Sequence, residues 1–204
     1  MARRPSASEG QSRAHGVREA VDREYREAVT GLGTMRARIL FFLAILVTSA
    51  GFDQGSKEWA REALPPHVVQ PVIDGYWDWQ LEQNPGAAFS TLAAATGSTA
   101  TLLHVGFGVI AMVALIALGI AAARTRPEQR LKRVALALIA GGALGNLIDR
   151  IASGDVTDFV RWHWHEHMWP IFNVADAALV IGVALLLGEE LLARRKSSRP
   201  APAA

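Results

Sequence analysis

Four long apolar runs divide the chain into alternating hydrophobic and polar segments. They cover Ile39–Phe52, Thr99–Ala123, Val134–Ile148 and Pro170–Leu187. A membrane-spanning helix needs about 20 predominantly apolar residues, and the second run reaches that length alone. The other three reach it if the polar residues beside them lie near the ends of spanning helices. The pattern therefore predicts an all-α membrane protein, a bundle of four transmembrane helices.

The longest polar connection, residues 57–98, has the pattern of short strands separated by turns. Val68-Val69, Val72-Ile73 and Tyr76–Leu81 are rich in β-branched and aromatic residues, with prolines and glycines between them. We expect a small extracytoplasmic β element here. The other outer connection, 149–170, is predicted to be a loop that contains Asp158.

Basic residues are distributed unevenly among the polar segments. Seventeen of the 21 Lys and Arg lie before the first run, between the second and third, or after the fourth. Because cytoplasmic segments carry the excess of Lys and Arg, both termini are predicted to be cytoplasmic. Residues 1–35 are predicted to be a charged, disordered cytoplasmic extension, 36–192 the membrane domain, and 193–204 a basic cytoplasmic tail. The chain has no cysteine, which excludes disulfides, thiolate zinc sites and cysteine nucleophiles.

Ionisable and amide side chains near the apolar runs all fall at predicted outer ends, and none at an inner end. A carboxylate at the centre of a membrane helix costs about 2.5–3.5 kcal/mol, so such residues indicate function. Several share one helix face because they lie three or four positions apart. These residues are Asp53, Lys57, Asn84, Asn146, Asp149, Arg150, Asp158, Asn173 and Asp176.

Such a cluster suits acid–base catalysis by paired carboxylates. Two carboxyl groups in a poorly hydrated pocket share one proton, so one can activate water while the other protonates a carbonyl oxygen. This is the chemistry of an aspartic protease. The residues alone leave the pairing open among Asp149, Asp158 and Asp176, with Asp53 less favoured.

Five short motifs occur in an order that resembles the lipoprotein signal peptidase (signal peptidase II) family. They are Asp53-Gln-Gly-Ser-Lys57, Asn84-Pro-Gly-Ala-Ala-Phe-Ser90, Gly141-Gly-Ala-Leu-Gly-Asn-Leu-Ile-Asp-Arg150, Val156-Thr-Asp-Phe159 and Phe172-Asn-Val-Ala-Asp176. The resemblance covers residues 36–192. It implies a membrane aspartic endopeptidase that cleaves bacterial prolipoproteins just before a diacylglyceryl-modified cysteine.

The resemblance also implies roles for individual residues. Asp158 and Asp176 would be the catalytic pair, and Asp149 a structural support paired with Arg150. The asparagines at 84, 146 and 173 would line the site and hydrogen-bond the substrate or a catalytic carboxylate, while Asp53 and Lys57 would brace the first span. No cofactor or metal is implied. The partners would be lipid-modified prolipoproteins and membrane lipids, with no nucleic acid. The protein would be a monomer of the bacterial inner membrane, with its active site near the outer leaflet.

Two other functions compete with a protease. A proton-coupled carrier could use the aspartates as a relay, but a relay needs polar groups along the full membrane depth. A non-catalytic scaffold could bind a partner through residues 57–98, but it leaves the embedded aspartates unexplained. His163, His165 and His167 alternate and would share one strand face that could bind a metal. A belt of Trp and His at the membrane interface is the favoured interpretation of this segment.

Overall fold

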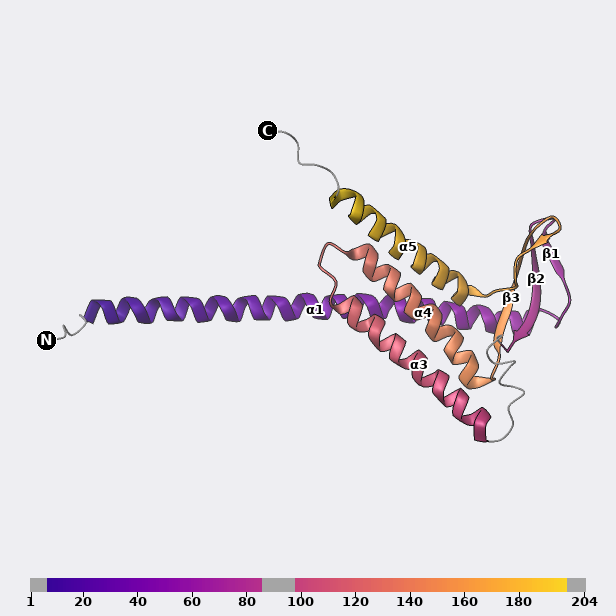
Figure 1. The fold of residues 1–204 in the computed structure, drawn as a ribbon, viewed down its shortest axis with the longest axis horizontal. Coiled ribbons are helices and arrows are strands. Elements are labelled where there is room, and N and C mark those ends of the chain that lie inside the picture. Colours follow the sequence, from indigo (N-terminus) through magenta and orange to yellow (C-terminus); the bar gives the residue numbers. More distant parts are fainter. Residues whose placement is uncertain (1–6, 86–97, 198–204) are drawn as a thin grey trace.

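The computed structural model describes residues 7–85 and 98–197, which form helices and one small sheet (Figure 1). The elements in chain order are α1 (Ala7–Ala63), β1 (Gln70–Ile73), β2 (Trp77–Asn84), α3 (Ser98–Ala123), α4 (Arg130–Ala152), β3 (Val156–Trp164), β4 (His167–Met168) and α5 (Val174–Ser197). The sheet lies at one end of the helices, and the N-terminal part of α1 extends away from the other end.

α4 is the central helix, since it packs against α1, α3 and α5. Small residues on α4 allow this close approach. A Cβ atom added at Gly142 would collide with the backbone carbonyl of Ala175 on α5, and one added at Gly141 would lie 2.7 Å from the Cβ of Ser49 on α1. Larger side chains at these positions would push the helices apart, so the sequence fixes the spacing of the bundle here.

Large apolar side chains cover the outside of the helices. The exposed fraction is 64–69% for each of five such side chains: Leu40, Val47, Phe52, Ile110 and Val180. Contiguous exposed apolar surface of this kind marks contact with lipid or protein. Among the described residues, two helices are long and apolar enough to cross a membrane, Gly31–Ala63 and Arg130–Ala152, and Gly108–Ala123 is a shorter apolar helix.

The sheet combines segments from both outer connections. Its four antiparallel strands have the order β1-β2-β3-β4, and β2 pairs with β3 over most of its length. A cluster of Ala60, Leu64, Leu81 and Phe159 packs the end of α1 against the sheet. The sheet is therefore attached to the bundle and holds β3 directly above the helix ends.

Several predicted boundaries differ from the structure. α1 continues to Ala63, so the outer connection begins later than residue 57. The prediction that Asp158 lies in a loop is wrong: it lies in β3, which pairs with β2 through the register Glu82↔Asp158. Sequence periodicity missed the start of this strand because Val156–Phe159 are all buried, so the polar–apolar alternation of a half-buried strand is absent around Asp158.

Two further expectations concern the end of the molecule opposite the sheet. Residues 1–35 were expected to be disordered, whereas α1 is helical from Ala7 and continuous with the first apolar run. The Ala, Arg and Glu of this segment are strong helix formers, which explains the difference. Arg133 is only 6% exposed at this end, where the sequence predicted no embedded ionisable group.

Candidate active site

The N-terminus of α5 is closed by a reciprocal pair of hydrogen bonds. Asn173, the residue before the helix, accepts a hydrogen bond on Oδ1 from the Asp176 N–H at 3.1 Å. Asp176 in turn accepts one on Oδ2 from the Asn173 N–H at 3.3 Å. This is a capping box, and its location explains why an aspartate is tolerated in an apolar run. The positive end of the helix dipole also favours the negative charge of Asp176.

β3 brings Asp158 beside this helix end. The N–H groups of Phe159 and Val160 donate to the carbonyl of Phe172, and the Phe172 N–H donates back to Val160. This pairing aligns the residue before Phe159 with the residue after Phe172. Asn173 Nδ2 accordingly donates to Asp158 Oδ1 at 2.6 Å.

Amide groups contact both carboxylates. Asn84, the last residue of β2, donates from Nδ2 to Asp158 Oδ2 at 2.8 Å. Asn146 on α4 donates from Nδ2 to Asp176 Oδ1 at 2.8 Å. Asn146 Oδ1 also accepts a hydrogen bond from Asn173 Nδ2 at 3.2 Å. The two aspartates are thus connected through two neutral amides, those of Asn173 and Asn146.

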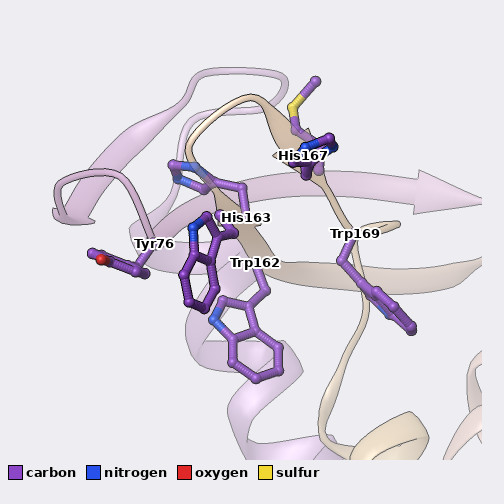
Figure 2. Close-up of a pocket in the computed structure, with 7 residues that line it drawn as sticks. Tyr76, Trp162, His163, His167 and Trp169 are labelled. Carbon is purple, nitrogen blue, oxygen red and sulfur yellow. The ribbon is translucent and has the colours of Figure 1, made fainter.

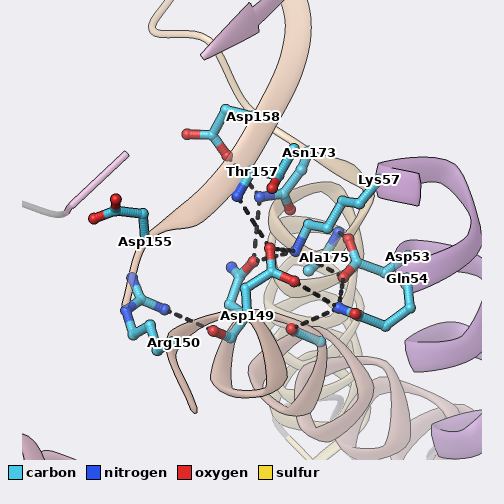
Figure 3. A network of polar contacts seen from close by, with 12 residues as sticks. Asp53, Gln54, Lys57, Asp149, Arg150, Asp155, Thr157, Asp158, Asn173 and Ala175 are labelled. Atoms are coloured by element: carbon cyan, nitrogen blue, oxygen red, sulfur yellow. Dashed lines mark hydrogen bonds and ion pairs between the residues drawn. The ribbon is translucent and has the colours of Figure 1, made fainter. Parts of the chain in front are cut away.

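Lys57 is fully buried and lies near Asn173, Asp53 and Asp149 (Figure 3). Its ammonium group lies 2.8 Å from Asp53 Oδ2 and 3.1 Å from Asp149 Oδ2. It also donates to Asn146 Oδ1 at 2.9 Å. Since an ammonium group has three N–H donors and no acceptor, all its hydrogen bonds are satisfied.

The two acids that pair with Lys57 are held from several sides. Asp53 Oδ1 accepts the Ala175 N–H of α5 at 2.8 Å, and Asp149 Oδ2 accepts the Thr157 N–H of β3 at 3.0 Å. Gln54 donates to both acids, at 3.3 Å to Asp53 and 3.0 Å to Asp149. These bonds join α1, α4, β3 and α5, so the ion cluster fixes the elements that carry the site.

Burial is the main electrostatic influence on Asp158. Loss of water contact raises the pKa of Asp158 to about 6, and the nearby Asp176 carboxylate adds to the rise. Hydrogen bonds from Asn84 and Asn173 partly offset the rise because they favour the ionised form. A carboxyl group with this pKa can exchange a proton near neutral pH.

The structure brings together the residues that the sequence singled out, with one change of partner. Asp149 pairs with Lys57, and Arg150 donates to the backbone carbonyl of Asn146 at 3.2 Å instead. Sequence reasoning gave no role to Gln54 and Thr157. Gln54 lies three positions before Lys57 and therefore on the same helix face, which is the signal that could have identified it.

The three histidines do not share a strand face. The chain reverses after Trp164, so β3 pairs His163 with Met168, and His165 lies in the turn with φ 51°. His163 and His167 help to line an aromatic cavity of about 340 Å³ with Tyr76, Trp162 and Trp169 (Figure 2). In the described part of the chain, no group of three or more His, Cys, Asp or Glu is placed to hold a metal ion.

Comparisons with known proteins identify the family of the chain. Residues 43–192 match the family model described as signal peptidase (SPase) II. Proteins named lipoprotein signal peptidase, from Xanthomonas campestris pv. campestris (strain 8004) and Syntrophotalea carbinolica, are 42% and 41% identical to the chain. Their alignments cover 72% and 74% of this chain and 87% and 89% of the relatives.

Two solved structures share the fold. Both are described as bacterial membrane enzyme structures determined by the in meso method, with TM-scores of 0.64 and 0.63 and identities of 29% and 30%. The alignments cover 80% and 74% of this chain and 94% and 92% of those chains. The chain therefore belongs to the signal peptidase II family of membrane proteases.

Proposed function

We propose that this protein is an aspartic endopeptidase that removes the signal peptide from bacterial prolipoproteins by cleaving just before the diacylglyceryl-modified cysteine. The observation that carries the proposal is the meeting of Asp158 and Asp176 at one end of the bundle, connected through Asn173 and Asn146. The names of the relatives support the substrate class.

The environments of the two carboxylates support a division of labour. Asp158 is buried, and its raised pKa favours the protonated form, while Asp176 lies at the positive end of α5. Asp176 takes a proton from water as the water oxygen attacks the scissile carbonyl carbon. Asp158 donates its proton to the carbonyl oxygen, which gives a neutral tetrahedral diol.

Collapse of the diol returns both carboxyl groups to their starting states. One diol hydroxyl gives its proton to Asp158 as the carbonyl re-forms, and the C–N bond breaks. Asp176 gives its proton to the leaving nitrogen, which becomes the amino group of the cysteine. The signal peptide leaves with a new carboxyl terminus, and the carboxyl pair holds one proton again.

The arrangement in the membrane is part of the proposal. We infer four spans, in α1, α3, α4 and α5, with both termini cytoplasmic and the carboxylate site near the outer leaflet. The exposed apolar side chains on these helices support it. Because the chain has no cysteine, single introduced cysteines test it cleanly. Asp74→Cys should react with an impermeant thiol reagent added outside the cell, and Glu128→Cys should not. The reverse labelling pattern would refute this orientation.

Cleavage of a synthetic diacylglyceryl-cysteine prolipoprotein by the purified full chain tests the activity. Asp158→Asn and Asp176→Asn should each lower kcat by about 10²–10⁴-fold, the usual contribution of a general acid or base. Asp155→Asn, three residues before Asp158, is the matched control and should retain the rate. The proposal fails if the double variant Asp158→Asn/Asp176→Asn cleaves at the wild-type rate.

A proton relay is the weaker alternative for this site. On α4, residues 134–145 contain no ionisable side chain, so no chain of acids continues from Asn146 toward the other end of that helix. Proteoliposomes would detect relay activity as proton flux that depends on Asp158. A carrier should show this proton flux even when only an unlipidated peptide is present. A protease of lipidated precursors should show no such flux.

A further inference from the structure

A second polar cluster lies at the end of the bundle opposite the carboxylates, where α1 passes the connection between α3 and α4 (Figure 1). Arg38 of α1 and Arg130 and Arg133 of α4 line a cavity of about 430 Å³ there. At 1.5 Å per residue, Arg133 lies about 20 Å along α4 from Asn146. The cavity is therefore separate from the active site.

Two of the arginines hold the connection in place. Arg38 Nη1 donates to the carbonyl of Thr125 at 2.7 Å. Arg133 Nη2 donates to the carbonyl of Pro127 at 3.0 Å and reaches that of Arg126 at 3.5 Å. Guanidinium groups near these carbonyls complement the negative end of the α3 dipole. This structural role uses only part of their five donors each.

The remaining positive charge is not neutralised by the protein. Among the side chains that the structure describes, no carboxylate forms an ion pair with any of the three arginines. Arg38 and Arg130 act on Arg133 as like charges. Arg133 is only 6% exposed, and its buried Nε has no hydrogen-bond partner. A buried cation without a counter-ion is costly, so the cavity is suited to an anion.

The position of the cavity favours a lipid anion over a soluble one. Arg38 directly precedes the apolar run that starts at Ile39, and Arg133 directly precedes the one that starts at Val134. Phe41, which lines the cavity, is 44% exposed on the apolar surface of α1. The guanidiniums thus lie at the polar–apolar boundary, the depth at which phospholipid phosphates lie, and apolar surface for acyl chains continues from there.

We propose that this cavity binds the phosphate of an anionic phospholipid headgroup, held by Arg38, Arg130 and Arg133. Arginine pairs with phosphate through several parallel N–H···O bonds, and basic pockets between membrane helices bind anionic headgroups. The bound phosphate would supply the missing partner of Arg133 Nε. It would also join α1 to the start of α4, so the lipid should stabilise the bundle.

Native mass spectrometry of the delipidated full chain, titrated with phosphatidylglycerol or phosphatidylcholine, tests the proposal. Arg130→Gln is the first variant because the Arg130 side chain makes no hydrogen bond or ion pair with the described residues, and Arg130→Gln/Arg133→Gln is the second. Each lost guanidinium should weaken phosphatidylglycerol binding about five-fold, the equivalent of about 1 kcal/mol. Binding of phosphatidylcholine should be weaker in the wild type and change little.

The matched control is Arg124→Gln/Arg126→Gln, which removes the same charge from exposed side chains of the same connection outside the cavity. It should bind phosphatidylglycerol like the wild type. Equal weakening in control and test variants would overturn the proposal, since general charge would then explain binding. Inorganic phosphate that matched phosphatidylglycerol in raising Tm would overturn the lipid assignment in favour of a soluble anion. An unchanged affinity in both test variants would refute the site itself.

Discussion

Replacing Lys57 by methionine should destabilise the protein more than any other single change at the site. Methionine keeps much of the apolar stem but removes the ammonium that contacts Asp53, Asp149 and Asn146 at 2.8, 3.1 and 2.9 Å. The two carboxylates are 0% and 4% exposed, so water cannot replace the lost partner. Breaking a buried ion pair by removing one side costs about 3–5 kcal/mol. Since two acids lose their partner here, we expect the upper part of that range.

Reversible unfolding of the purified chain in mild detergent measures this change in free energy. Glu58→Gln is the matched control, one residue further along α1. It breaks the exposed ion pair Arg61–Glu58, whose side chains are 36% and 61% exposed, and should change the free energy of unfolding by less than about 1 kcal/mol. If Lys57→Met and Glu58→Gln have the same effect, the buried cluster does not hold the site together.

Two further variants separate charge from packing. Substituting Asp53→Asn and Asp149→Asn in the Lys57→Met background removes the uncompensated negative charges and should recover part of the lost stability. The folded fraction of Lys57→Met should also show a lower kcat. Lys57 helps to hold Asn146 Oδ1, and without it the amide is freer to rotate away from Asp176. Unchanged kcat in folded Lys57→Met would contradict this coupling.

Three other outcomes test the site. The kcat/KM should fall as pH rises through an apparent pKa near 6, because Asp158, whose pKa is raised, then loses the proton that it shares with Asp176. A flat profile from pH 5 to 8 would contradict this. Gly145→Ala should lower the free energy of unfolding in detergent by about 1–3 kcal/mol, because the added Cβ would collide with the buried carboxylate of Asp53. Gly55→Ala is the control and should not destabilise the protein in this way, because the space around Gly55 is open. Asn173→Ala should cost about 0.5–2 kcal/mol from the lost helix cap, together with a lower kcat that a purely structural cap would not cause.

The helices were predictable because their apolar runs are long. The run from Thr99 to Ala123 corresponds closely to α3, and the run from Val134 to Ile148 lies inside α4. Their ends were less predictable. α1 continues past Lys57 because its amphipathic last turns pack on the sheet rather than on lipid, and that packing partner is distant in sequence. Hydropathy alone carries no information about it.

The sheet shows the opposite limitation. Strands in residues 57–98 were predicted, but β3 was not, although it carries Asp158. β3 exists because it pairs with β2 and because Phe172 bonds to its backbone. These are contacts between segments far apart along the chain. Local sequence could therefore indicate which residues matter while giving the wrong backbone for one of them.

Within the site, the motifs predicted the set of residues but not their partners. The asparagines were expected near the proposed catalytic carboxylates, and Asn84, Asn146 and Asn173 each donate to one of the two. The partner of Asp149 was expected to be its neighbour in sequence, and the structure gives Lys57 from another helix. The spacing of residues along one helix predicts contacts within that helix only, whereas the residues of this cluster come from three helices.

The contacts also distinguish the four acids among which the sequence left the proton-sharing pair open. Asp53 and Asp149 each form a buried ion pair with the Lys57 ammonium group, so their contacts serve to hold that cation. Asp158 and Asp176 contact neutral amide donors instead, and no ammonium or guanidinium of the described residues forms an ion pair with either. An amide orients a carboxyl group in either protonation state, because it supplies a hydrogen bond without a full charge. Asp158 and Asp176 are held in this way, and of the four acids they are the pair that we propose takes up and releases one proton during a turnover.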